Sequence, residues 1–417
     1  MAPSEPLVVS RQQWSRCVYI TAIATFILLW IFAWSWQSET IIPTNERDPQ
    51  WPVTEEYTME PMMTLPPDSD NLCTSDAYNV GKWVKKPVKL SSEDPKGVEK
   101  AAGYHCSWNF PHKCYRRLDE KGEFNRSVRI MDYQWQPSDC DMLPFDPKIF
   151  ANYLANHPLL FVGDSINQLA FESMACLLGE SLVDPSSNTN MTGGNTNLWA
   201  GQKVHKDKAL VEGAVTLGYL RTDYLVRLDD FKIMEPFDDE GYLIGKGSNF
   251  PWAHAIHRFD HIVINTGPHW HTNKLWGKEE SDDELMAAFN KAMRIVLEYL
   301  LDNLKPNQRV WVRSSPYGHA KCSQYTQPDQ VPHPPTRKPG EFQWDMHEKF
   351  DQVWRDMIES LNDSRIKFFN VSPMSNLRGD AHSRPDSDCL HTCLPGPVDD
   401  WNKLLFQEIA LEAAKGA

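Results

Sequence analysis

The sequence predicts an α/β fold in which a mostly parallel sheet is covered by helices on both faces. Short apolar runs typical of buried strands alternate along the chain with longer stretches whose apolar residues recur at helical spacing. The clearest run, residues 159–162, ends in Gly163-Asp164-Ser165, a turn signal that leads into a helical pattern over 166–178. Strands that alternate with helices in this way are typical of parallel sheets with both faces buried.

Composition narrows the range of partners. A chain of 417 residues with 41% hydrophobic and 24% charged residues has an ordinary globular balance and can bury a full-sized core. The formal net charge is −14, without a long acidic block. Because binding to nucleic acid needs a basic face, we expect no nucleic-acid partner. The same charge mildly favours a neutral glycan over a strongly anionic polymer.

The first element is an expected transmembrane helix over residues 17–36, a run of twenty residues without a charge. Arg11 and Arg16 precede the run and Glu39 follows it, so the positive-inside rule leaves the tail, residues 1–16, in the cytosol. The alternative is a cleaved signal peptide, for which Ala33 and Ser35 offer a small-x-small site. The length of the run and its tryptophan-rich end favour the anchor.

Residues 37–70 carry six prolines among polar residues without an apolar period, which predicts an extended stem. A cysteine-rich region over 71–141 follows, and it is too short to bury much core alone, so we expect it to be joined to the main domain, residues 142–417. Cys17 lies in the expected anchor, and the remaining eight are Cys73, Cys106, Cys114, Cys140, Cys176, Cys322, Cys389 and Cys393. An even number beyond a secretory anchor predicts disulfides of unknown pairing, with zinc as the less favoured alternative. Sequons at Asn125, Asn190, Asn362 and Asn370 agree with a lumenal chain.

The main domain begins with the strand over 159–163 and its helix. A Ser/Asn/Thr/Gly-rich stretch over 184–201 predicts a surface loop or an insertion. Further strands are expected at 218–228, 261–265, 309–313 and 367–371. Helices are expected at 281–304, around 350–361 and after Pro397, because apolar residues recur there on one face.

Four polar residues carry the expected chemistry. Ser165 would sit at a strand-to-helix junction, where free backbone N–H groups and the helix dipole favour an oxyanion. Asp388 precedes His391 by three residues, in a loop flanked by cysteines, so the carboxylate can orient the imidazole. Alone, a Gly-Asp-Ser turn is more often structural and such a histidine more often a surface residue. Together with Asn265, however, Ser165 and His391 each follow a predicted strand, at the sheet edge where sites assemble.

Three more residues are candidates for substrate binding. His269 and Trp270 follow the turn after Asn265 and could line a glycan groove by stacking on sugar, although packing under a loop is an equal alternative. Arg313 ends a predicted strand and could hold a polar donor or pair with a surface acid.

These motifs resemble the blocks of the trichome birefringence-like (PC-esterase) proteins, a branch of the SGNH/GDSL hydrolase superfamily. The resemblance rests on residues 163–165, on Asn265-Thr266-Gly267, on the segment 388–402 (DCLHTCLPGPVDDWN), and on the GKWV and WQP-x-x-C elements of the cysteine-rich region. It covers about residues 73–402. It implies an SGNH-like sheet sandwiched by helices in a single-pass type II Golgi membrane protein with a lumenal catalytic domain.

By this resemblance Ser165 is the nucleophile, His391 the general base and then acid, and Asp388 its orienting carboxylate. Asn265 would stabilise the oxyanion beside the Ser165 backbone N–H. The chain departs from the family at Asn167-Gln168-Leu169, where Ser-Arg-Asn is frequent, and at Thr392, where Trp is frequent. The superfamily's second-block glycine has two candidates, Gly213 and Gly218.

The resemblance implies a polysaccharide O-acetyltransferase that forms an acetyl-serine intermediate on a cell-wall or secreted glycan. It implies no bound cofactor or metal, and an acetyl donor, acetyl-CoA or another carrier, as co-substrate. One alternative is a carbohydrate acetylesterase with the same triad. A second alternative, from another class, is a catalytically silent glycan-binding protein, which the intact Ser165, Asp388 and His391 argue against.

Overall fold

A computed structural model of the chain describes residues 71–106, 110–182, 189–192, 195–200, 216–226, 228–229, 232–233, 252–338 and 342–416. The chain forms two units, Met1–Glu60 and Pro61–Ala417, and all described residues belong to the second. The expected cytosolic tail, membrane anchor and stem, residues 1–70, lie outside the described residues. Within the described ranges, no helix has both the length and the apolar character needed to cross a bilayer.

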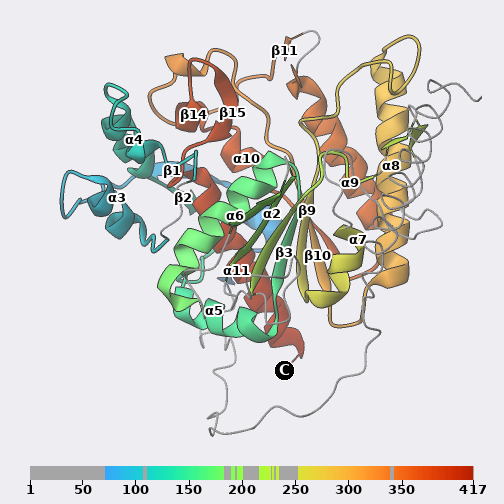
Figure 1. Cartoon of the computed structure of the whole chain (residues 1–417), viewed down its shortest axis with the longest axis horizontal. Coiled ribbons are helices and arrows are strands. Elements are labelled where there is room, and N and C mark those ends of the chain that lie inside the picture. The colour runs from blue at the N-terminus through green and yellow to red at the C-terminus, as the bar shows by residue number, and fades with distance from the viewer. Residues whose placement is uncertain are drawn as a thin grey trace, which may run out of the picture. The chain divides into compact units, whose positions relative to one another are not determined.

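A seven-stranded sheet forms the centre of this unit (Figure 1). Its strands, in spatial order, are β13 (Ile366–Phe369), β10 (Arg309–Arg313), β9 (His261–Asn265), β3 (Leu159–Gly163), β6 (Leu217–Arg221), β5 (Asn195–Ala200) and β4 (Thr189–Thr192). The first five are mutually parallel, while β5 and β4 run antiparallel to their neighbours. The carboxyl ends of the five parallel strands therefore meet at one edge of the sheet.

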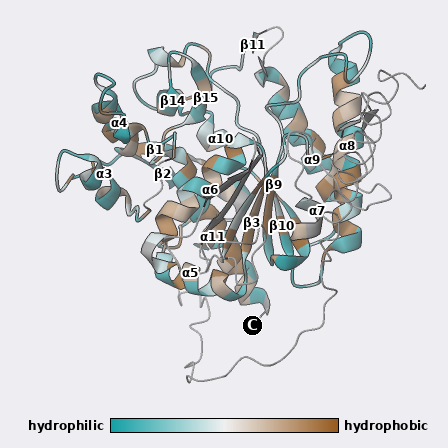
Figure 2. Ribbon diagram, viewed as in Figure 1, coloured by the Kyte–Doolittle hydropathy of each residue, from teal (hydrophilic) through white to brown (hydrophobic). Residues whose placement is uncertain are grey.

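Both faces of the sheet are covered, as the sequence predicts. Successive side chains of a strand point to opposite faces, so in β3 Leu159 and Phe161 join one core while Leu160 and Val162 join the other. The first core lies under α5 (Pro147–Asn156), α6 (Ser165–Leu178) and α11 (Pro397–Gly416), and the second under α7 (Trp252–Ala255), α8 (Asp282–Asn303) and α9 (His347–Leu361). Figure 2 shows the apolar strands between these two layers.

Local sequence signals account for where the helices begin. Asp146 and Asp164 accept hydrogen bonds from first-turn N–H groups of α5 and α6, which satisfies donors that have no partner inside the helix. At α8, Ser281 and Glu284 form a reciprocal capping box. The short elements are α2 (Ser75–Tyr78), α10 (Ser372–Ser375), β7 (Leu228–Asp229), β8 (Lys232–Ile233), β11 (Arg337–Lys338), β12 (Phe342–Gln343), β14 (His382–Arg384) and β15 (Asp388–Thr392).

Two sequence expectations need correction. The strand expected over 218–228 ends at Arg221, because Thr222 Oγ1 accepts a hydrogen bond from Leu225 N at 3.2 Å and Leu225 adopts a left-handed backbone (φ 62°). Its apolar residues Leu225 and Val226 are buried in the second core instead of continuing the sheet. The stretch 184–201, expected as a surface loop or the start of an insertion, contains the β4–β5 hairpin, whose pairing depends on backbone groups that a Ser/Asn/Thr/Gly-rich composition does not reveal.

The cysteine-rich region contributes a two-stranded antiparallel sheet and two helices: β1 (Gly81–Lys85) paired with β2 (Tyr133–Pro137), α3 (Pro95–Ala102) and α4 (Glu123–Met131). This pairing places Trp83 against Trp135 with ring centroids 5.5 Å apart, and both rings join the core that contains α6 and α11. Trp83 also donates from Nε1 to the carbonyl of Met374 at 2.9 Å. The region is therefore packed into the same core as the main domain.

The eight cysteines form four disulfides, as expected: Cys73–Cys140, Cys106–Cys176, Cys114–Cys393 and Cys322–Cys389. This pairing consumes the thiols that the zinc alternative would need. Of the sequons, Asn125 and Asn362 are exposed, whereas Asn370 is 9% exposed, so the folded chain does not present it for glycosylation. The side chain of Asn190 lies outside the described residues.

Candidate active site

Ser165 is the first residue of α6, directly after β3 and the capping residue Asp164. Asp164 Oδ1 accepts a hydrogen bond from Ile166 N at 2.8 Å, which fixes the turn. Burial raises the pKa of the Asp164 carboxyl, while His269 and Arg313 oppose that shift through their charges. The start of α6 leaves backbone N–H groups without partners in the helix and carries the positive end of the helix dipole, which suits a developing negative charge beside Ser165.

Gly163 makes this turn possible. Its φ is +150°, and a Cβ built there would lie 2.4 Å from the carbonyl oxygen of Asn265 on the neighbouring strand β9. Glycine alone tolerates both the backbone angle and the close approach. The ends of β3 and β9 therefore lie close enough to bring Ser165 and Asn265 to the same edge.

A continuous hydrogen-bonded line joins the three residues expected to form a triad. Ser165 Oγ lies 2.7 Å from His391 Nε2, and His391 Nδ1 lies 2.8 Å from Asp388 Oδ2. A carboxylate only accepts, so the Nδ1 proton faces Asp388 and leaves Nε2 free to accept the serine proton. Residues separated by more than two hundred positions thus have the geometry of a nucleophile, its base and an orienting acid.

Asp388 is held in its ionised form. Burial tends to raise its pKa, but the hydrogen bond and charge of His391, together with the backbone N–H groups of Leu390 and His391, hold the pKa well below its usual range. The carboxylate therefore remains negative at neutral pH and can stabilise a positive imidazolium on His391.

The segment that carries Asp388 and His391 is anchored from several sides. It forms β15, pairs with β14, and is joined through Cys389 to Cys322 and through Cys393 to Cys114. Behind it, buried His382 donates from Nδ1 to the carbonyl of His391 at 3.3 Å, and its other ring nitrogen lies 2.8 Å from His319 Nδ1. Such cross-links restrict the loop before substrate arrives, which lowers the entropic cost of aligning it.

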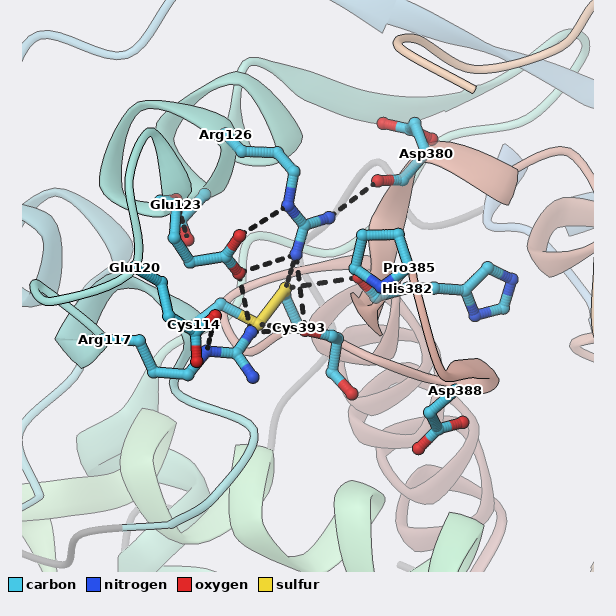
Figure 3. A network of polar contacts seen from close by, with 12 residues as sticks. Cys114, Arg117, Glu120, Glu123, Arg126, Asp380, His382, Pro385, Asp388 and Cys393 are labelled. Atoms are coloured by element: carbon cyan, nitrogen blue, oxygen red, sulfur yellow. Dashed lines mark hydrogen bonds and ion pairs between the residues drawn. A yellow bond between two sulfur atoms is a disulfide. The ribbon is translucent and has the colours of Figure 1, made fainter. Parts of the chain in front are cut away.

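A network of arginines adds a further anchor (Figure 3). Arg126 on α4 points toward Glu123, with Nε to Oε2 at 2.9 Å, and its Nη1 donates to the carbonyl of Asp380 at 3.2 Å. Arg117 donates to Glu123 Oε1 at 2.6 Å and also contacts the carbonyl of Ser383. The cysteine-rich region thus holds the strand β14 that pairs with the histidine-bearing β15.

Asn265 ends β9 and is fully buried. Its Nδ2 donates to Ser315 Oγ at 3.0 Å. An amide nitrogen carries two hydrogens, so this bond leaves the second hydrogen for another acceptor.

Arg313 does not pair with a surface acid, which is one of the two roles expected from the sequence. Its side chain is 1% exposed, and its guanidinium also donates to the carbonyl of Ser314. Nε donates to Asn167 Oδ1 at 2.9 Å, and Asn167 in turn donates to the carbonyls of Val162 and Val263. Burial lowers the pKa of Arg313 to about 10. The arginine supports Asn167, which ties β3 to β9 beneath Ser165.

Trp270 adopts one of the two alternatives that the sequence left open. It is 0% exposed, stacks on Trp276 at 4.7 Å between ring centroids, and meets the edge of Phe289 at 5.1 Å. No ring face is left for a sugar, so the packing alternative holds for this residue. His269 differs, because its side chain is 34% exposed and its Nε2 lies 3.5 Å from Asp223 Oδ1.

Several residues near the site were not predicted from the sequence. Arg221 ends β6 opposite Gly163 and donates to Asp223 Oδ1 at 3.1 Å, so Arg221, Asp223 and His269 form a polar group at the catalytic edge. Polar residues that directly follow a strand are candidates for a site at the sheet edge. Arg221 and Asp223 would have been candidates on this ground if the predicted strand had ended at 221 instead of 228. His112 and Glu172, described below, carried no comparable signal.

The second-block glycine remains without a candidate among the described residues. Gly218 lies inside β6, paired with Leu160 and Trp199, well before the carboxyl end of the strand. Gly213 lies outside the described residues. Thr392, where the family often has Trp, ends β15 with its hydroxyl buried.

The fold and the site together define an α/β protein with a serine-based acyl-transfer geometry at the carboxyl edge of its sheet. The family model described as PC-Esterase, the GDSL/SGNH-like acyl-esterase family found in Pmr5 and Cas1p, matches residues 143–408. This match covers more than half of the chain, so the chain belongs to the PC-esterase family, as the sequence motifs predict.

Plant proteins are among the relatives of this chain. Xylan O-acetyltransferase 6 of Oryza sativa subsp. japonica is 25% identical, over 68% of this chain and 56% of its own length. Protein trichome birefringence-like 9 of Arabidopsis thaliana is 24% identical, over 80% of this chain and 83% of its own length. The chain thus spans little more than half of the rice relative. A solved structure described as a possible arylesterase of Agrobacterium tumefaciens str. C58 aligns with 62% of this chain and 99% of its own, at 13% identity and a TM-score of 0.29.

Proposed function

We propose that the chain is a polysaccharide O-acetyltransferase that acts on a cell-wall or secreted glycan through an acetyl-serine intermediate. The observation that carries the proposal is the hydrogen-bonded line from Ser165 Oγ through His391 to Asp388. Relatives named xylan O-acetyltransferase support an acetyl group and a polysaccharide acceptor. A purely glycan-binding protein would have no need for this line.

In the first half-reaction, His391 Nε2 takes the proton of Ser165 as Oγ attacks the acetyl carbonyl of the donor. The oxyanion that forms is stabilised by the backbone N–H of Ser165 and the free amide hydrogen of Asn265. Asp388 stabilises the imidazolium. His391 then gives its proton to the leaving group, the bond from carbonyl carbon to donor breaks, and an acetyl ester remains on Ser165.

In the second half-reaction, a sugar hydroxyl replaces the donor. His391 accepts the hydroxyl proton as the oxygen attacks the acetyl-serine carbonyl, and it returns the proton to Ser165 Oγ when the ester breaks. His269, which is partly exposed beside Asp223, binds glycan hydroxyls in this proposal. The donor is acetyl-CoA or another acetyl carrier, used as a co-substrate.

An esterase is the second candidate, because the family model itself describes an acyl-esterase. The same site hydrolyses esters whenever water, in place of a sugar, attacks acetyl-serine. The two activities therefore differ in the acceptor and share every catalytic residue.

The proposal places the chain in the Golgi membrane as a single-pass type II protein with a lumenal catalytic domain. The uncharged run over 17–36 and the arginines before it support this orientation. Four disulfides support folding in an oxidising compartment.

The test uses purified full-length chain in detergent, a labelled acetyl donor and a panel of neutral and acidic glycans. We expect label on a glycan with the wild type and none with Ser165→Ala. Label released only as free acetate would establish the esterase. Equal activity of Ser165→Ala would refute the proposed nucleophile.

A further inference from the structure

The cysteine-rich region is joined to the elements of the active site through Cys106 and through residues 110–114, in addition to the arginine contacts described above. Cys106 is bonded to Cys176 on α6, the helix that begins with Ser165. Cys114 is bonded to Cys393, two residues after His391. The backbone of residues 110–114 also contacts the chain just after His391, since Leu394 N donates to the carbonyl of His112 at 2.8 Å. Residue 112 is therefore held between the helix that begins with Ser165 and the segment that carries His391.

The imidazole of His112 lies face to face with that of His391. The ring centroids are 5.3 Å apart and the planes differ by 16°, which is the geometry of an offset-stacked aromatic pair. The side chain of His112 is 17% exposed. It is therefore a mostly buried ring that covers one face of the proposed general base.

A carboxyl group holds His112 in turn. Glu172 lies seven residues after Ser165 on α6 and is fully buried. Its Oε2 lies 3.3 Å from His112 Nδ1, and its Oε1 accepts from Gln168 Nε2 at 2.8 Å. A buried carboxyl group without partners is costly, so these two bonds fix the rotamers of Glu172 and His112 together.

We propose that His112, held by Glu172, is a positioning residue for His391, a role that rests on the proposed acyl-transfer function. The hydrogen bonds of His391 to Asp388 and Ser165 lie in the plane of its ring and limit where its two nitrogens point. Hydrogen bonds tolerate a broad range of ring tilt, whereas a second ring stacked on the face restricts it. His112 therefore keeps Nε2 aligned with the Ser165 hydroxyl through both half-reactions.

A matched pair of variants tests this role. His112→Phe and His112→Leu both lose the bond to Glu172 and both introduce an apolar side chain, but only phenylalanine presents a flat ring to His391. With p-nitrophenyl acetate as acetyl donor, we expect His112→Leu to lower kcat about tenfold with little change in KM, because misalignment affects the transition state more than binding. His112→Phe should recover most of that loss.

His157→Ala is the control. His157 also pairs with a carboxylate, Asp260 at 2.8 Å, and stacks on an aromatic ring, Tyr153, but it precedes β3 at the opposite edge of the sheet. The kcat of His157→Ala should equal that of the wild type. The inference is overturned if His112→Leu and His112→Phe have equal kcat, or if the loss lies in KM. Turnover by Ser165→Ala would instead refute the proposed function. The kcat values of the two His112 variants would then carry no information about a triad.

Discussion

At the residue scale, the proposed mechanism depends on a carboxylate that orients the imidazole of His391. Asp388 uses Oδ1 for two backbone N–H groups and Oδ2 for His391, so each oxygen has a separate task. This division fixes the carboxylate independently of the imidazole. In the proposed mechanism, the imidazole of His391 is therefore already oriented when it accepts the proton of Ser165.

Asp388→Asn tests that role. An amide in place of the carboxylate removes the negative charge and can present N–H to Nδ1, which favours the wrong tautomer of His391. We expect kcat to fall by about 10³-fold to 10⁴-fold, measured with p-nitrophenyl acetate. Asp386→Asn, an exposed change in the same loop, should have wild-type kcat. Similar kcat values for the two variants would contradict the role of Asp388.

The sequence predicted the positions of Ser165, Asp388 and His391 because each belongs to a short motif beside a strand or a cysteine pair. It left open whether Trp270 binds sugar or packs under its loop, and it did not predict that Arg313 lies in the core. Proximity to a strand end locates the backbone at the catalytic edge, but the side chain can still turn down into the core, as both of these do. Only three-dimensional packing decides that direction.

At the element scale, the β14–β15 loop depends on covalent anchors. Cys114–Cys393 joins residues separated by 279 positions in the sequence and attaches the loop to the cysteine-rich region. Cys73–Cys140 joins residues separated by 67 positions and does not contact the triad residues. The sequence predicted that these cysteines form disulfides but could not give the pairing, because contact between residues so far apart depends on the complete fold.

Removal of each of these two disulfides should have different consequences. The paired change Cys114→Ser and Cys393→Ser should lower stability by about 2–5 kcal/mol and should also lower kcat at a temperature where the chain stays folded. The paired change Cys73→Ser and Cys140→Ser should lower stability but leave kcat near that of the wild type. Denaturant unfolding and steady-state kinetics measure both quantities, and an unchanged kcat in the first pair would count against the anchoring role.

At the scale of the whole molecule, buried ionisable groups make stability depend on pH. Asp351 on α9 is buried and accepts hydrogen bonds from Ser315 N at 2.9 Å and Ser372 Oγ at 3.1 Å. Burial raises its pKa from 3.8 to about 7, and these bonds only partly oppose the shift. Between these values the folded state holds a proton that the unfolded state has released, so stability falls as pH rises.

Asp351→Asn removes this titration. Relative to the variant, the wild type should lose about 1.4 kcal/mol per pH unit between about pH 4 and pH 7, and no more above that window. Thermal unfolding across this range measures the difference. Asp356→Asn, an exposed change on the same helix, should run parallel to the wild type. If Asp351→Asn also ran parallel to the wild type, the raised pKa would be refuted.

The architecture as a whole was the most predictable feature. The parallel strands and their covering helices follow from hydrophobic periodicity, which is a local property of the chain. The contribution of the cysteine-rich region to the core and to the catalytic loop was less predictable, because Trp83, Arg126 and His112 act through partners more than two hundred residues away.

The acetyl-serine intermediate is the central claim, and mass spectrometry of the acid-quenched enzyme tests it most directly. After brief mixing with an isotope-labelled acetyl donor, the peptide that contains Ser165 should carry one labelled acetyl group, and a glycan acceptor should remove it. Ser165→Ala should carry no label. Sustained acetyl transfer without label on Ser165 under these conditions, or equal turnover by Ser165→Ala, would contradict the account.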